Sequence, residues 1–199
     1  MQIPALAGFF FYNLLMPEDI PKVVKFLKLE LPDEIADLDI EDYKKFLNEF
    51  LIPFQGEDAM IIEKSSIPIE KYLILFEALN FISPSVALED INKEKYLIFD
   101  HNFQDVYYLE DINIKFKNIN FKSDKEPLEV LELNLEQIYE ENKDLEKALE
   151  EIKKVVVPAQ VCVLKGTTPL LLFLIISYGL RPLVAELYYD KVSELIKIF

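Results

Sequence analysis

The stretch that decides the fold is residues 161–190, with the sequence VCVLKGTTPLLLFLIISYGLRPLVAELYYD. With the valines at 155–157, its first four residues have the apolar pattern of a buried β-strand, which the polar residues 165–168 end. Pro169 suits the first position of a helix, Thr168 is a candidate N-cap, and Gly179 is a candidate stop. A second apolar strand pattern follows in residues 182–188. The stretch therefore predicts a β-loop-α-β unit.

A helix between two buried strands predicts a parallel sheet with a right-handed crossover. Ligands of such sheets lie beyond the carboxyl ends of the strands. The residues expected at that place are Lys165, Gly166, Thr167 and Thr168. A lysine, a glycine that permits close backbone approach, two hydroxyls and free N–H groups suit a phosphate. The full spacing of a nucleoside triphosphatase loop is absent, and an ordinary βα turn is the alternative.

Composition limits the classes of function. Half of the 199 residues are hydrophobic, which is enough to bury a core, and the net charge is −15. Binding of long nucleic acid depends on many lysine and arginine contacts to phosphates, so this charge argues against it. The chain has one arginine (Arg181), one histidine (His101) and one cysteine (Cys162). An internal disulfide and a Cys/His metal cluster are therefore excluded, and we expect no metal and no other cofactor.

Two apolar runs are candidates for a membrane segment or a leader. Leu170–Ile176 is too short to cross a bilayer, and Ala5–Met16 is interrupted by Asn13 and lacks a basic leader. We therefore expect a cytoplasmic protein without a membrane partner.

Further elements are predicted along the chain from apolar periodicity. Strands are expected at 9–12, 59–62, 85–88 and 95–99, and a β-hairpin within 107–121. Helices are expected from Pro17 to near Leu31, over 40–51 with Asp39 as N-cap, after Pro68, and over the Glu-rich segment 127–154.

The order strand, lysine, hydroxyl, proline, helix, strand occurs twice. Lys64, Ser66 and Pro68 correspond to Lys165, Thr167 and Pro169, each 101 positions later. This predicts an α/β fold of two tandem Rossmann-like βαβ halves, residues 1–92 and 93–199, with mostly parallel sheets related by a pseudo-twofold axis. The second half would carry the hairpin and the long acidic helix as additions. Two unrelated βαβ units in one sheet are the alternative.

Three features resemble the CRISPR-associated Rossmann fold sensors and ring nucleases of type III CRISPR antiviral signalling. They are the strand-to-loop segments Phe11-Tyr12-Asn13 and Phe99-Asp100-His101, the loops at Lys64 and Lys165, and the last strand after Gly179-Leu180-Arg181-Pro182.

The resemblance implies a cyclic oligoadenylate as ligand, a nucleotide ring bound across a twofold axis. Such domains usually form homodimers, whereas here one chain would supply both halves. The residues that the resemblance assigns to ligand binding are Asn13, Lys64, Ser65, Ser66, Asn102, Gly166, Thr167, Thr168 and Arg181.

Cleavage of such a ring needs no metal, because a ribose 2′-OH attacks the adjacent phosphate and leaves a 2′,3′-cyclic phosphate. Lys165 would stabilise charge on the phosphorane, and His101 would act as general acid or base. Two other interpretations stay open. One is a regulatory or adaptor protein that binds a protein partner through its acidic helix, and the other is an enzyme for a different phosphorylated metabolite.

Overall fold

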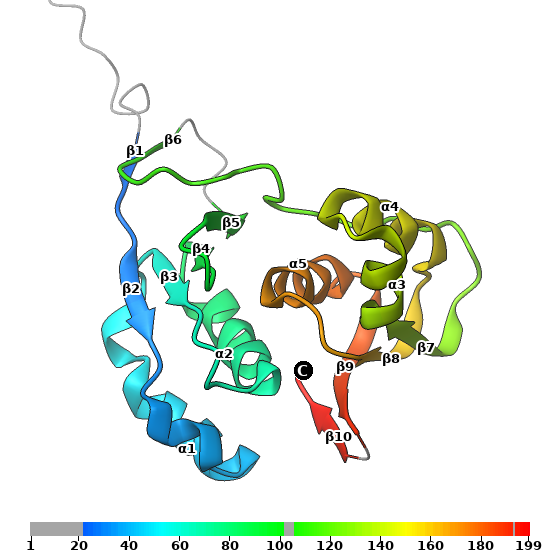
Figure 1. Cartoon of the computed structure of the whole chain (residues 1–199), viewed down its shortest axis with the longest axis horizontal. Helices are drawn as coiled ribbons and strands as arrows, with labels where there is room; N and C mark the ends of the chain where they lie inside the picture. Colours follow the sequence, from blue (N-terminus) through cyan, green and yellow to red (C-terminus); the bar gives the residue numbers. More distant parts are fainter. Residues whose placement is uncertain (1–21, 102–105, 193) are drawn as a thin grey trace, which may run out of the picture.

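The computed structural model describes residues 22–101, 106–192 and 194–199. The predicted strand at 9–12 and the predicted ligand-binding residues Asn13 and Asn102 lie outside this part of the chain. Within it, the chain forms a mixed α/β fold whose sheets are mostly parallel, as the sequence predicts (Figure 1).

The first unit is a four-stranded sheet in the described residues, with the order β2-β3-β4-β5. Strands β2 to β4 are parallel, and β5 runs antiparallel to β4. Helix α1 connects β2 to β3, and α2 connects β3 to β4. The elements are β2 (Leu27–Glu30), α1 (Ile40–Phe50), β3 (Ala59–Ile62), α2 (Ile69–Ile82), β4 (Ser85–Glu89) and β5 (Lys95–Asp100), with short 3-10 helices at Asp33–Asp37 and Ile52–Phe54.

The second unit repeats this order. Its described sheet is β7-β8-β9-β10, with the first three strands parallel and β10 antiparallel to β9. Helices α3 and α4 connect β7 to β8, and α5 connects β8 to β9. The elements are β7 (Leu128–Asn134), α3 (Leu135–Asn142), α4 (Leu145–Val155), β8 (Ala159–Lys165), α5 (Leu170–Leu180), β9 (Val184–Lys191) and β10 (Glu194–Lys197).

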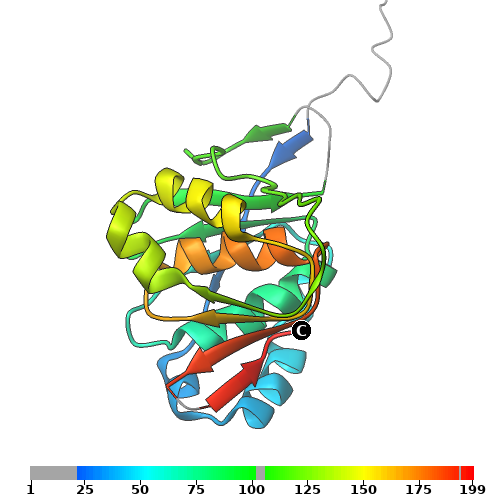
Figure 2. The same ribbon diagram turned by 90° about the vertical axis from the view of Figure 1, so that its right-hand side faces the viewer.

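Helices α2 and α5 lie between the two sheets, as Figures 1 and 2 both show. All but one residue of α5 (Tyr178) are buried, and one continuous apolar core contains residues of both helices and of both sheets. The apolar all-round sequence of α5 is explained by this place, because a helix enclosed on all sides has no polar face.

The outer face of the first sheet is covered by a second, smaller apolar cluster. Strand β1 (Lys22–Val24) pairs in parallel with β6 (Val106–Tyr108), and residues of this two-stranded ribbon pack against the sheet. Val24 and Phe26 pack there against Met60, with Tyr108 at the edge. Every residue of β3 and β4 is consequently buried.

Four sequence predictions of secondary structure are wrong. The helix expected from Pro17 to Leu31 is replaced, in its described part, by β1 and β2, because Leu29 is the residue of β2 that is buried and β2 pairs with β3. The hairpin expected in 107–121 does not form, since β6 pairs with β1 and Phe116 and Phe121 enter the core. The valines at 155–157 end α4 and follow it, and the strand begins at Ala159.

The fourth wrong prediction is the long helix over 127–154. Its first part is strand β7, in which Leu131 and Leu133 alternate with exposed glutamates. Lys143 then adopts a left-handed conformation (φ 51°) that separates α3 from α4. Strand β5, which the sequence analysis placed at the start of the second half, completes the first sheet instead. The units are therefore residues 27–100 and 128–197.

Candidate functional site

The loop after β8 is held by carboxylates of its own unit. Lys165 Nζ lies 2.7 Å from Glu132 Oε2 and 3.8 Å from Asp190 Oδ2. Thr167 donates from its backbone N (3.3 Å) and its Oγ1 (3.1 Å) to the carboxylate of Glu136, the second residue of α3. Gly166 has φ +92°, and a Cβ there would lie 2.4 Å from Glu136 Cβ. The two donors of Thr167 that a phosphate would use at this loop are thus paired with Glu136.

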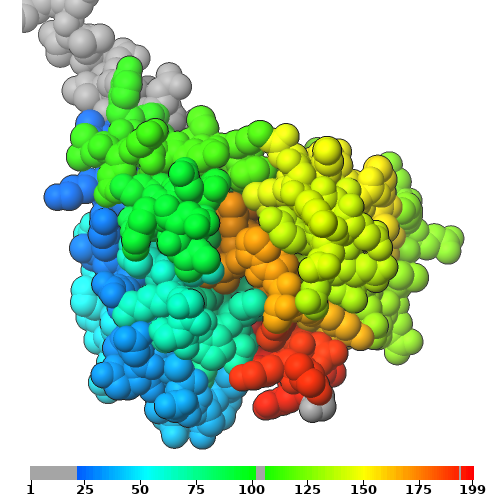
Figure 3. All heavy atoms as spheres, viewed as in Figure 1, coloured from blue at the N-terminus to red at the C-terminus, as the bar shows by residue number. Residues whose placement is uncertain are grey.

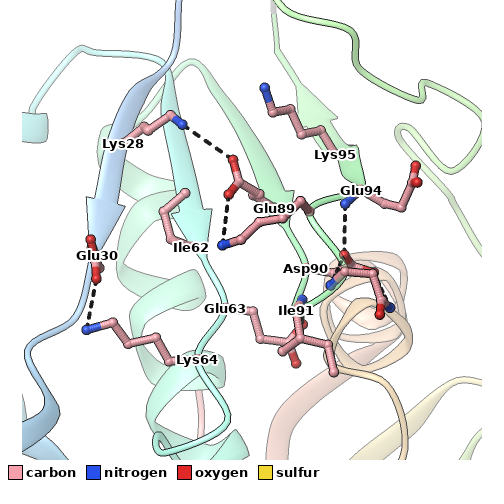
Figure 4. A network of polar contacts seen from close by, with 12 residues as sticks. Lys28, Glu30, Ile62, Glu63, Lys64, Glu89, Asp90, Ile91, Glu94 and Lys95 are labelled. Carbon is pink, nitrogen blue, oxygen red and sulfur yellow. Dashed lines mark hydrogen bonds and ion pairs between the residues drawn. The ribbon is translucent and has the colours of Figure 1, made fainter.

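The loop after β3 has the same arrangement. Lys64 Nζ lies 3.0 Å from Glu30 Oε1 (Figure 4). It also donates to the Leu31 carbonyl oxygen (2.8 Å) and lies 3.5 Å from Asp33 Oδ1. Ser66 Oγ donates to Asp33 Oδ1 at 2.8 Å. Ser65 is exposed in the turn between them. In both units a lysine and the second residue after it contact acidic groups, so the similarity of the two loops extends to side chains.

The charges of both loop lysines are thus balanced inside the protein. The hydrogen bond that Lys64 donates to Glu30 raises the pKa of Lys64, and the one that Lys165 donates to Glu132 raises the pKa of Lys165. Both lysines remain protonated near neutral pH, but each is already paired, so neither is a free cation for a ligand phosphate.

His101 and Arg181 lie elsewhere. The His101 backbone N donates to the Pro84 carbonyl oxygen, before β4, and its ring contacts Phe99 at 4.6 Å between centroids. Arg181 follows α5, forms a bidentate ion pair with Glu77 of α2, and lies 4.7 Å from the Phe81 ring. A shallow pocket of about 370 Å³ contains both His101 and Arg181.

The structure therefore separates the residues that the sequence analysis assigned to one site. Lys165 precedes α5 and Arg181 follows it, and a helix of 11 residues is about 16 Å long. His101 belongs to the Arg181 end, so it cannot share a proton-transfer site with Lys165. This corrects the predicted catalytic pair: the loop residues lie at the carboxyl ends of the parallel strands, and His101 and Arg181 lie at the opposite ends.

A pocket of about 530 Å³ lies between the two units, and we call it the inter-unit pocket. In Figure 3 the orange surface of α5 is visible at the boundary between the blue-to-green first unit and the yellow second unit. The first unit contributes the ends of β3 and β4 and a tyrosine of β5, and the second contributes α3, α4 and the start of α5. The lining residues are Glu63, Asp90, Ile91, Asn92, Tyr96, Tyr139, Leu145, Thr168, Pro169 and Leu171.

The polar side chains of this pocket differ in whether they have hydrogen-bond partners. Glu63 Oε2 accepts from the Ile91 backbone N (3.3 Å), and burial raises the pKa of Glu63 (Figure 4). Asp90 accepts from the backbone N of Asn92 and of Glu94, which fixes the β4–β5 turn. Thr168 Oγ1 is buried and has no hydrogen-bond partner among the described residues. Thr168 does not cap α5, whose N-cap is Pro169, so its buried hydroxyl is an unsatisfied polar group at the wall of the pocket.

The repeat relates the inter-unit pocket to a second place, where the start of α2 meets the second sheet, and that place is closed. Glu70 corresponds to Leu171, which stands 101 positions later. Ile62 pairs with Glu89 in the first sheet, and the corresponding Val163 pairs with Tyr188 in the second. Residues after β4 therefore correspond to residues 99 positions later, and Lys191 is the counterpart of Asn92. Lys191 and Glu70 form an ion pair in which Glu70 is 3% exposed. Where α2 meets the second sheet, this ion pair bridges the two units. Where α5 meets the first sheet, the inter-unit pocket stays open.

Sequence reasoning found Thr168 of this pocket and missed its other polar residues. Glu63 follows the end of β3 and directly precedes Lys64, which was predicted as a ligand-binding residue. Tyr96 and Tyr139 carry no local signal, since tyrosines in apolar patterns are usually core residues.

Comparisons with protein-family models, with curated proteins and with solved structures gave no match. In the described ranges, no helix combines the length and the apolar character that a bilayer span requires. The same residues contain no group of three or more histidine, cysteine or acidic side chains placed to hold a metal ion.

Proposed function

We propose that this protein binds a nucleotide of the cyclic oligoadenylate class in the inter-unit pocket. The observation that carries the proposal is that the strand-end loops of the first unit and the start of α5 meet at one pocket between two repeated units. Ligands of open parallel sheets lie at this edge.

The groups in the pocket suit one adenylate of such a ring. Tyr96 and Tyr139 offer aromatic faces on which an adenine can stack. Glu63 and Asp90 offer oxygens that accept hydrogen bonds from the adenine amino group or from ribose hydroxyls. The Thr168 hydroxyl and the first N–H groups of α5 suit a phosphate. A volume of about 530 Å³ lies in the range of small-ligand sites, so the remaining nucleotides would extend outside the pocket.

The proposal is for binding. The hypothesis of ring cleavage by His101 and Lys165 loses its basis, because a general acid and a charge-stabilising group must both reach the reacting phosphate. Any cleavage would have to use groups of the pocket itself.

The test is a thermal shift of the protein with cyclic tri-, tetra- and hexa-adenylate, with AMP for comparison, followed by chromatography of the same samples for linear products. A bound ring raises the melting temperature by mass action. The variant Thr168→Val removes the unpartnered hydroxyl at nearly constant volume and should reduce the shift. Lys165→Ala, outside the pocket, is the matched control and should leave the shift unchanged.

Two outcomes contradict the proposal. Absence of a shift with every ring excludes the ligand class and directs the search to a protein partner. A shift that Lys165→Ala abolishes and Thr168→Val preserves moves the ligand from the inter-unit pocket to the loop after β8.

A further inference from the structure

The ribbon of β1 and β6 has one covered side and one bare side. Val24 and Tyr108 face the first sheet, whereas Val23 and Tyr107, which are direct partners in the ribbon, are 57% and 65% exposed. Leu109, two residues after Tyr107, is 63% exposed and extends the ribbon through a hydrogen bond from its N to the Val24 carbonyl oxygen. We call Val23, Tyr107 and Leu109 the ribbon patch.

A two-stranded ribbon is marginally stable in water unless a further element packs against it. The inner side of this ribbon lies on the sheet, but the ribbon patch places three large apolar side chains together on the other side. Grouped exposed apolar residues of this kind mark a contact surface more often than scattered ones do.

We propose that the apolar run Ala5–Met16 of the same chain covers the ribbon patch. This run lies outside the described residues and is joined to Lys22 of β1 by residues 17–21 alone. Five residues span at most about 18 Å, so the run cannot move far from the ribbon. Such a short tether holds it at an effective concentration in the millimolar range, which favours contact within the chain over contact with a second copy.

Charge supports the same occupant. The tether carries Glu18 and Asp19, and Lys25 is an exposed residue next to the ribbon patch, whereas Lys22 lies 3.6 Å from Asp58. The tether and Lys25 therefore carry opposite charges. The ribbon patch is on the outer side of the first sheet, so this proposal stands or falls independently of the nucleotide.

The test is a double-mutant cycle in the full chain. Tyr107→Ser changes the patch, and Phe10→Ser with Phe11→Ser changes the run. Each change should lower the melting temperature by about 2–4 °C and increase the fluorescence of a dye that binds apolar surface. If run and patch touch, the combined variant should lose no more than the larger of the two separate losses.

The control is Ile52→Ser, a similarly exposed apolar residue (61%) in the 3-10 helix after α1. Its effect should add to that of either change. Additive losses from patch and run, or no loss from either, would overturn the proposal. A concentration-dependent dimer in sedimentation that Tyr107→Ser dissociates would assign the ribbon patch to a second copy instead.

Discussion

Replacement of Gly179 by alanine tests how the segment between the two units packs against α5. A Cβ at this position would lie 2.5 Å and 2.7 Å from Cε2 and Cδ2 of Phe121 and 3.0 Å from the Ile119 carbonyl oxygen. Ordinary van der Waals contact is 3.4–4 Å. The Phe121 ring, which is 3% exposed, would therefore have to move by about 1 Å inside a filled core.

Two opposing effects set the size of the change. Alanine is better than glycine in a helix interior by about 1 kcal/mol. Insertion of a methyl group into a well-packed core costs about 1–3 kcal/mol. Gly179→Ala should thus destabilise the protein by about 1 kcal/mol, which for a chain of this size lowers the melting temperature by about 2–4 °C.

The assay is thermal unfolding followed by circular dichroism, in wild-type and Phe121→Leu backgrounds. Without the ring the two shortest contacts are relieved and the contact with the Ile119 carbonyl oxygen remains, so Gly179→Ala should destabilise this background less than it destabilises the wild type. The reasoning is refuted if Gly179→Ala raises the melting temperature of the wild type, or if its effect is equal in both backgrounds.

Three further predictions follow from single residues. Burial raises the pKa of the Cys162 thiol to about 12, so thiol reagents should modify it only as fast as the protein opens, and rapid labelling of native protein would contradict this. Asp39 Oδ1 accepts from Asp42 N at 2.8 Å at the start of α1, so Asp39→Ala should lower stability by about 1 kcal/mol while Asp39→Asn should lower it less in a denaturant titration. Burial raises the pKa of Glu89, but Lys93 and Lys28 outweigh it and hold the pKa below its ordinary value. Its stabilising effect is present above about pH 4.3 and lost as pH falls through the lowered pKa, so Glu89→Gln should flatten the acid loss of stability below about pH 4.3.

The elements that the sequence predicted well are those with punctuation at their ends. Asp39 caps α1, Pro68 and Pro169 precede α2 and α5, and the apolar strands before and after those helices have strong β-formers. These signals are local, so they survive without knowledge of the fold.

The prediction of secondary structure was wrong where the same residues fit both the periodicity of a helix and that of a strand. Leu128, Leu131 and Leu135 match a helix, while Leu131 and Leu133 match a strand, and pairing of β7 with β8 decides between them. The segment 22–30 is similar, because β2 is an edge strand with three of its four residues exposed, which weakens the alternating pattern. In both cases, pairing with a strand that comes later in the sequence decides the secondary structure.

The site was only partly predictable for a related reason. The two lysine loops were found from their spacing, but the carboxylates that neutralise them, Glu30 and Glu132, stand more than 30 residues earlier in the sequence. The separation of His101 from Lys165 follows from β5 joining the first sheet, which no local pattern indicates.

The shared core around α2 and α5 bears on the clefts between the two units. A unit of this size standing alone would expose the helix face that the other unit now buries, and so small a core is marginal. Two identical units packed in this way would form two identical clefts. The two units of this chain differ in sequence, and their clefts differ with them. The Glu70–Lys191 ion pair fills one cleft and the inter-unit pocket remains in the other, so a twofold arrangement of elements carries one open cleft.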